Sequence, residues 1–237
     1  MIFPERPLVL GHRGSPARAP ENTLRGFRLA AEEGADGVEL DVQPAADGTP
    51  VVIHDATLDR TTGARGAVAA LGWGEIGAAR AGGEPVPRLE EAARWAAESG
   101  AWLNVEIKSP GAEAASIAAI EAAGVLERTF FSSFLPDVVE RVGELAPHAT
   151  RFLLTERWDD DARAAARRLG VHGVCLHHAA ATPAALGELR GAGLDVVVWT
   201  VDDPARLGEL LRTGVRAVIT NHPARGVAAL REVLGGA

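Results

Sequence analysis

The chain alternates apolar, strand-like runs with helical runs along most of its length, and this alternation constrains its fold more than any other feature. The strand-like runs cover residues 8–10, 37–42, 103–107, 129–132, 151–154, 173–176, 195–200 and 215–220. Helical runs begin near residues 21, 89, 112, 136, 159, 182, 204 and 224. Several begin with capping chemistry, such as Thr182 before Pro183, and glycines such as Gly100 and Gly170 follow their ends. Near-continuous apolar strands of this kind are typical of a parallel sheet that is buried on both faces.

Eight strands alternating with eight helices predict an α/β fold of the (β/α)8 TIM-barrel type, because closing the sheet leaves no unpaired edge. An open, doubly wound sheet is the alternative. That fold normally carries a G-x-G-x-x-G phosphate loop after a strand, and this sequence has none. A length of 237 residues is ordinary for one barrel, so we expect a single domain over residues 1–237.

A ninth strand-like run, residues 50–53, follows the second strand too closely for a helix to lie between them. Asp47 and Gly48 separate the two runs, and an Asp-Gly pair is a strong signal for a β-hairpin. We therefore expect the second strand to continue above the barrel, turn, and return antiparallel, which brings His54 back toward Asp41. Residues 55–87, rich in Gly and Arg, then form a short cap insertion.

Two strands carry charged residues at alternate positions. Glu39 and Asp41 lie in the second strand, and Glu106 and Lys108 lie at the end of the third. Side chains at i and i+2 of a strand point to the same face, so each pair projects together. Ionised groups that face inward are costly unless they meet a cation, an anion or each other. Three carboxylates and one lysine together indicate a site that binds a divalent cation next to an anionic ligand such as a phosphate.

The three carboxylates offer hard oxygen ligands, which suit Mg²⁺ or Ca²⁺, and Mn²⁺ is also compatible. Two alternatives are chance alternation in half-buried strands and an acidic cluster that Lys108 and Arg13 neutralise without a metal. Lys108 is the only lysine among 24 basic residues. Because all the other basic residues are arginines, a single lysine suggests a position that needs a more compact positive charge than a guanidinium.

Two histidines come at the ends of strand-like runs. His12 follows residues 8–10 after one glycine, and His54 directly follows residues 50–53. Histidines in such positions fit general acid and base work. Arg13 presents a planar set of donors suited to phosphate oxygens, although an arginine alone more often makes a surface ion pair. The carboxyl ends of barrel strands are where barrel enzymes place catalysis.

The polar motifs also occur in a recognisable order. The series is His12-Arg13-Gly14, Glu21-Asn22-Thr23, Glu39-Leu40-Asp41, His54-Asp55, Leu58-Asp59-Arg60-Thr61-Thr62, Glu106-Ile107-Lys108, Ser133-Phe134, Trp199-Thr200-Val201 and Thr220-Asn221-His222-Pro223. This series resembles the glycerophosphodiester phosphodiesterase family, in the phospholipase C-like phosphodiesterase barrel group, over residues 11–223. Asp202 departs from the family pattern, where asparagine often follows Trp-Thr-Val, and so does Asn221, where aspartate is usual after threonine. We expect these departures to affect substrate fit more than chemistry.

The resemblance implies metal-dependent hydrolysis of glycerophosphodiesters, such as glycerophosphocholine or glycerophosphoethanolamine, to glycerol 3-phosphate and an alcohol. It implies that Glu39, Asp41 and Glu106 hold one divalent cation. His12 and His54 would divide the proton transfers as general acid and base, and their order stays open. The attacking oxygen is either water or the substrate's own hydroxyl, which would give a cyclic phosphate first.

The remaining site residues are assigned to substrate binding. Arg13 and Lys108 would hold phosphate oxygens, Phe134 and Trp199 would form apolar walls for glycerol carbons, and His177 would line the pocket. His178 is expected to be structural. Asn22 is expected either to cap the first helix or to act in catalysis, and Asp55 to orient a neighbour.

Two other functions stay open at this point. The first is a lysophospholipase D-like or phosphoinositide-type phosphodiesterase on the same barrel. The second is a non-catalytic barrel that binds a phosphometabolite. The chain has no long apolar insertion to engage lipid, and a binding protein would not need the histidine pair, so both are less favoured than hydrolysis of water-soluble diesters.

Composition limits the partners and the location. A net charge of −8 argues against binding nucleic acid or an anionic membrane, since either needs a basic patch. Cys175 is the single cysteine, which excludes an internal disulfide. We see neither a signal peptide near residues 1–7 nor an apolar run of membrane-spanning length. We therefore expect a cytoplasmic protein that acts on a small molecule, and a homo-oligomer is compatible with the sequence.

Overall fold

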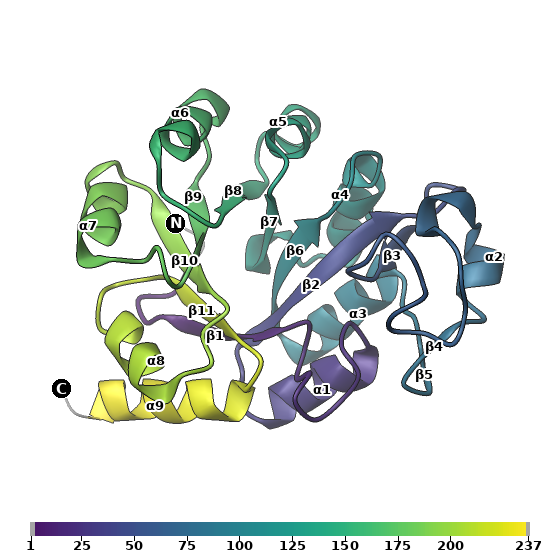
Figure 1. The fold of residues 1–237 in the computed structure, drawn as a ribbon, viewed down its shortest axis with the longest axis horizontal. Helices are drawn as coiled ribbons and strands as arrows, with labels where there is room; N and C mark the ends of the chain where they lie inside the picture. Colours follow the sequence, from purple (N-terminus) through teal and green to yellow (C-terminus); the bar gives the residue numbers. More distant parts are fainter. Residues whose placement is uncertain (1–2, 236–237) are drawn as a thin grey trace.

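Eight parallel strands form a closed barrel in the structure, which is a computed structural model and describes residues 3–235. The two residues at each end of the predicted domain lie outside this range. The barrel strands are β1 Leu8–His12, β2 Gly37–Pro44, β6 Trp102–Ile107, β7 Thr129–Ser133, β8 Thr150–Thr155, β9 Gly173–His177, β10 Asp195–Trp199 and β11 Ala217–Thr220. Neighbouring strands pair in parallel around the ring, and pairing of β1 with β2 closes it (Figure 1). The predicted TIM barrel is confirmed.

Helices follow the strands and cover the outside of the barrel (Figure 1). They are α1 Leu24–Glu32, α3 Leu89–Ser99, α4 Glu113–Ala122, α5 Pro136–Leu145, α6 Asp160–Leu169, α7 Pro183–Gly191, α8 Pro204–Leu211 and α9 Pro223–Gly235, with a short 3-10 turn, η2 Leu126–Arg128, before β7. The side chains of Thr23, Asp159, Thr182 and Asp203 accept hydrogen bonds at the N-termini of four helices. Among the described residues, no helix is long and apolar enough to cross a membrane.

Strand alternation separates an apolar interior from an apolar outer layer. On β1, Leu8 and Leu10 belong to the interior cluster, whereas Val9 packs with the helices. The interior cluster also holds Phe130 and Phe152, whose ring centroids lie 5.0 Å apart. These rings fill the barrel below the carboxyl ends of the strands, and the charged side chains of the predicted site lie nearer those ends.

The predicted hairpin and cap insertion are both present. Strand β3, Pro50–Val52, pairs antiparallel with β2, and Gly48 takes a left-handed φ of 81° in the turn between them. The insertion contains η1 Val68–Ala70, α2 Trp73–Ile76, β4 Arg80–Ala81 and β5 Glu84–Pro85. Its apolar side chains, such as Leu58 and Ile76, form one small core together with Ile53 of the hairpin. This arrangement holds the segment around His54 over the mouth of the barrel.

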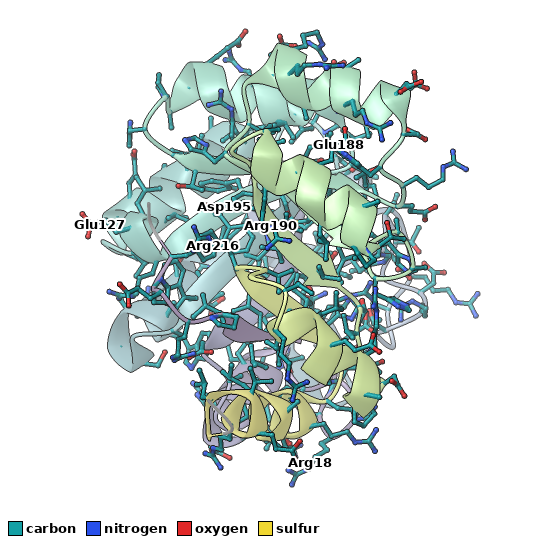
Figure 2. The ribbon with its side chains drawn as sticks, turned by 90° about the vertical axis from the view of Figure 1, so that its left-hand side faces the viewer. Arg18, Glu127, Glu188, Arg190, Asp195 and Arg216 are labelled. Atoms are coloured by element: carbon teal, nitrogen blue, oxygen red, sulfur yellow. The ribbon has the colours of Figure 1, made fainter. Side chains whose placement is uncertain are left out.

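Two ion pairs lie away from the polar layer, one where the strands begin and one between outer helices. The guanidinium Nε of Arg216 lies 2.6 Å from Oδ1 of Asp195, at the starts of β11 and β10 (Figure 2). Figure 2 also shows Glu188 on the outer helix α7, where Oε1 lies 2.6 Å from Nε of Arg163 on α6. The first pair lies at the face of a barrel that serves stability, and the second joins two neighbouring helices of the outer layer.

Candidate active site

Strand register brings the three predicted carboxylates together. On β2, Val38, Leu40 and Val42 pack outward under the helices, so Glu39 and Asp41 point into the barrel. In the register between β2 and β6, Asp41 lies opposite Glu106. One oxygen from each of Glu39, Asp41 and Glu106 lies within 4.8 Å of the others. The i, i+2 rule places Glu39 beside Asp41, and the pairing of β2 with β6 adds Glu106, the third acid expected in the predicted metal site.

The acidic cluster is buried, and two of its oxygens are unsatisfied. Oε1 of Glu39 and Oδ1 of Asp41 accept no hydrogen bond from any described residue. Burial, together with the charges of Asp41 and Glu106, holds the pKa of Glu39 well above its usual range. Burial and then Asp41 likewise raise the pKa of Glu106 to about 7. An acidic pocket with free inward oxygens fits a bound cation, because carboxylates this close repel one another without one.

Two positively charged side chains, Lys108 and Arg13, lie beside the acidic cluster but do not pair with all of its oxygens. The Lys108 ammonium donates to Oε1 of Glu106 at 2.6 Å and lies 3.6 Å from Oδ1 of Asp41. Nε of Arg13 lies 3.1 Å from Oδ2 of Asp41, and the Arg13 backbone N–H donates to Oε2 of Glu39 at 3.0 Å. Both long side chains are mostly covered, so each charge faces the pocket and not bulk solvent.

Backbone strain occurs at two residues of the site. Arg13 and Asn22 both have φ near 54°, a left-handed conformation that non-glycine residues rarely adopt. The Asn22 backbone N–H donates to the carbonyl of Arg13, and its side-chain Nδ2 donates to Oδ2 of Asp41 at 2.8 Å. Asn22 therefore orients an acid of the cluster. The capping role considered for Asn22 is wrong, because Thr23 caps a helix that begins at Leu24.

The two histidines line one pocket with Glu39, Glu106 and Lys108. Nε2 of His12 lies 3.9 Å from Oε2 of Glu39. Burial, and then the Arg13 charge, lower the pKa of His12. His54 reaches the pocket from the hairpin side, as expected from its position after β3.

The two histidines have partners of different charge. Nδ1 of His54 lies 2.7 Å from the carboxylate Oδ1 of Asp55, consistent with the orienting role expected for Asp55. Nδ1 of His12 lies 2.7 Å from the amide Oδ1 of Asn221. The first partner is ionisable and the second is neutral, so the two imidazoles face unlike environments.

Aromatic side chains form the wall of the pocket opposite the hairpin. The rings of Phe134 and Trp199 meet edge to face with centroids 5.5 Å apart, and both residues line the pocket. Phe134 is 39% exposed, so its ring is open to a ligand. His177, which was expected to line the pocket, contacts Trp199 with ring centroids 5.1 Å apart, but it is not among the residues that line the pocket. His178 packs against His177.

Comparison with known proteins agrees with this geometry. The sequence matches the glycerophosphoryl diester phosphodiesterase family over residues 12–225. The chain belongs to this family. It is 34% identical to a glycerophosphodiester phosphodiesterase of Caldanaerobacter subterraneus subsp. tengcongensis, covering 91% of this chain and 94% of that protein. The family and the enzyme class expected from the motifs are confirmed.

Solved structures of similar proteins share the barrel. A glycerophosphodiester phosphodiesterase of Agrobacterium tumefaciens superposes with a TM-score of 0.83 at 30% identity, covering 94% of this chain and 99% of that one. A phosphodiesterase of Oleispira antarctica, solved in complex with the product sn-glycerol-3-phosphate, has a TM-score of 0.85 at 29% identity, covering 95% and 97%. Both likenesses extend over nearly the whole phosphodiesterase barrel.

Further residues of this phosphodiesterase became visible only in the folded chain. Nε of Arg60 lies 2.6 Å from Oδ2 of Asp55, and its Nη2 donates to Oε1 of Glu21 at 2.8 Å. The same Oε1 accepts from Nη1 of Arg13 at 3.0 Å. Arg60 thus links the partner of His54 to the partner of Arg13. Its place in the Leu58–Thr62 motif was the only signal in the sequence.

Asn104 is another pocket residue that the sequence analysis missed. It precedes Glu106 by two positions on β6, lines the pocket, and lies opposite Glu39 in the register with β2. Its Nδ2 donates to Oγ of Ser132 at 2.7 Å. The same i, i+2 rule that paired Glu106 with Lys108 could have identified it.

Proposed function

We propose that this chain is a metal-dependent hydrolase that cleaves glycerophosphodiesters to glycerol 3-phosphate and an alcohol. The observation that carries the proposal is the buried cluster of Glu39, Asp41 and Glu106, which has free inward oxygens and shares its pocket with His12 and His54. The product bound in the Oleispira antarctica relative supports glycerol 3-phosphate as the product here. Glycerophosphocholine and glycerophosphoethanolamine are the proposed substrates.

The three carboxylates would hold one divalent cation, Mg²⁺ or Ca²⁺, with Mn²⁺ as a further option, because hard oxygen donors suit all three. Such a cation would supply positive charge to the phosphate oxygens, where negative charge accumulates during displacement. The unsatisfied oxygens of Glu39 and Asp41 fit this group, since they would otherwise stay buried without a partner.

The side chains around the cluster then divide the remaining work. Arg13 and Lys108 would hold the non-bridging oxygens and stabilise the charge of the transition state. His12 and His54 would transfer protons, one from the attacking oxygen and the other to the leaving alkoxide. Phe134 and Trp199 would pack against glycerol carbons. The attacking oxygen is water or the neighbouring glycerol hydroxyl, and detection of a cyclic phosphate would decide between them.

Measurement of glycerol 3-phosphate tests the function directly. We expect its release from glycerophosphocholine and glycerophosphoethanolamine in the presence of Mg²⁺, Mn²⁺ or Ca²⁺, and loss of release in EDTA. Lysophosphatidylcholine and glycerophosphoinositol, assayed in parallel, distinguish the lipid-cleaving and phosphoinositide alternatives. Binding of glycerophosphocholine without turnover under any metal condition would instead identify a non-catalytic barrel.

Lys108 provides a prediction about phosphate binding. Lys108→Ala removes a charge that faces the pocket, so we expect kcat/KM to fall by about 10- to 100-fold, the scale of a hydrogen bond to a charged group. Lys108→Arg keeps the charge but places a larger, planar guanidinium in a covered site. It should therefore also lower kcat/KM, by less than Lys108→Ala does. Wild-type kcat/KM in both variants, with unchanged melting temperatures, would place Lys108 outside the phosphate site.

We also propose that residues 1–237 form one domain and that the cap insertion is part of it. The insertion shares an apolar core with Ile53 of the hairpin, and Arg60 attaches it to Glu21 beside α1. The cytoplasmic location and the homo-oligomer that is compatible with the sequence stay predictions.

A further inference from the structure

A chain of hydrogen bonds runs from His12 through Asn221 to Asp202, which lies in the loop after β10. The amide Nδ2 of Asn221 donates to Oδ2 of Asp202 at 2.7 Å, and the Asn221 backbone N–H donates to Oδ1 at 2.8 Å. The Thr220 hydroxyl also donates to Oδ1, at 3.0 Å. Asp202 therefore accepts hydrogen bonds from both the backbone and the side chain of Asn221, the residue that contacts His12.

In this series of hydrogen bonds, the groups that can only accept determine which atom donates in each bond. An ionised carboxylate can only accept, so the amide nitrogen of Asn221 must face Asp202 and the amide oxygen must face His12. Burial opposes ionisation of Asp202, but the hydrogen bonds from Asn221 and Thr220 outweigh it and lower the pKa of this carboxyl. Since an amide oxygen is also only an acceptor, Nδ1 of His12 must carry a proton to make its 2.7 Å contact.

The geometry points to Asn221 and Asp202 as positioning residues that hold His12 in the Nδ1–H tautomer, with the Nε2 lone pair directed at the pocket. Through the proposed function, on which this inference rests, a lone pair at Nε2 makes His12 the group that accepts the proton of the attacking oxygen. The carboxylate of Asp55 also fixes a proton on Nδ1 of His54, so the tautomer alone does not separate the two histidines. Asp55 is a charged partner that can stabilise an imidazolium, whereas the partner of His12 is a neutral amide, so His54 is assigned as the proton donor to the leaving group. Neither Asn221 nor Asp202 needs to touch the substrate.

The two departures from the family pattern, expected from the sequence to affect substrate fit more than chemistry, instead lie next to His12 and are in contact with each other. By the resemblance described above, asparagine would be expected at position 202 and aspartate at position 221, whereas this chain has Asp202 and Asn221. The two residues are in direct contact, so the departures form one exchange of an amide and a carboxylate across a hydrogen bond. With the exchange, Nδ1 of His12 still faces an acceptor oxygen, that of Asn221. The negative charge, however, lies on Asp202, one side chain further from His12.

An exchange of this kind can be reversed by mutation. Asn221→Asp places two carboxylates in contact, and Asp202→Asn leaves the Asn221 amide free to rotate and to present its NH₂ group to His12. We expect each single variant to lower kcat by about 10- to 100-fold, the scale for partners that orient a functional histidine. The double variant Asp202→Asn/Asn221→Asp restores an acceptor for His12 and a donor between the two side chains, so it should regain most of the lost kcat.

Asp203→Asn is the matched control. It makes the same chemical change one residue along the chain, at the N-cap of α8, where asparagine caps as well as aspartate does. We expect it to keep wild-type kcat and melting temperature. A double variant no more active than the poorer single variant would overturn the inference, because the two residues would then not act as a unit.

A spectroscopic measurement tests the tautomer without relying on turnover. In ¹⁵N-histidine-labelled protein at pH 8, two-bond ¹H–¹⁵N correlations, assigned with His12→Gln, should show the proton on Nδ1 in the wild type. Asp202→Asn should shift the proton toward Nε2, and the double variant should return it to Nδ1. An Nε2–H tautomer in the wild type would refute the inference. If no diester is hydrolysed, the proposed function fails while this readout still decides the role of Asn221 and Asp202.

Discussion

His54→Ala and His12→Ala should each lower kcat by about 10²- to 10⁴-fold, the usual loss when a positioned acid or base is removed. Both residues lie at strand ends and face a polar pocket, so we expect little change in melting temperature. Steady-state kinetics on glycerophosphocholine, with glycerol 3-phosphate as the measured product, give the kcat of each histidine variant separately.

The leaving group separates the two histidine roles. A diester of glycerol 3-phosphate and p-nitrophenol needs no proton donor, so it should restore turnover in the variant that lacks the acid and leave the other slow. From the roles inferred for the two histidines, the restored variant should be His54→Ala. His148→Ala is the control, because this exposed histidine pairs with Glu121 on the surface and should keep wild-type kcat. Near-normal turnover in either pocket variant would remove that histidine from the mechanism.

Removing the metal, or one of its ligands, is expected to have an effect of similar size. Treatment with EDTA should lower kcat by about 10²-fold or more, because a bound cation contributes several kcal/mol of charge stabilisation and each 1.36 kcal/mol is tenfold in rate. Addition of Mg²⁺, Mn²⁺ or Ca²⁺ should restore activity. Glu39→Gln should be inactive with any of the three. Full activity in EDTA, with no response to added metal, would disprove the metal site.

Thermal unfolding measures the same site without substrate. A cation at 100 times its Kd stabilises the folded state by about 2.7 kcal/mol, which for a chain of this size raises the melting temperature by roughly 5–10 °C. Glu39→Gln should abolish this rise. Glu113→Gln should keep it, because Glu113 is equally buried but lies on α4 outside the cluster.

Metal-free protein should also lose stability as the pH rises. The pKa of Glu106 is raised from its ordinary 4.5 to about 7, so this group contributes stability below pH 4.5 that is lost as the pH rises through about 7. The melting temperature in EDTA should therefore fall between about pH 4.5 and pH 7, relative to Glu106→Gln. Saturating metal should reduce the fall, because it binds the ionised carboxylates.

Much of the fold was predictable because its signals are local. Strand alternation, helix caps such as Thr182 and the Asp47-Gly48 turn each depend on residues close in the sequence. The predicted strands match the barrel strands to within two residues at each end. The start expected for the first helix, residue 21, is too early, because Glu21 and Asn22 resemble the start of a helix, whereas their side chains bind Arg60 and Asp41 instead.

The order of the motifs likewise identified the family, and the i, i+2 rule was enough to place Glu39 beside Asp41. What the sequence by itself determined was therefore the barrel, the family and the residue types of the site. Only the tertiary structure decided the contacts through which these residues meet. The register of β2 with β6 sets Glu106 against Asp41, and closure of the ring brings Asn221 to His12 across 209 positions of the chain. Those contacts depend on strand register and ring closure, which no short stretch of sequence encodes.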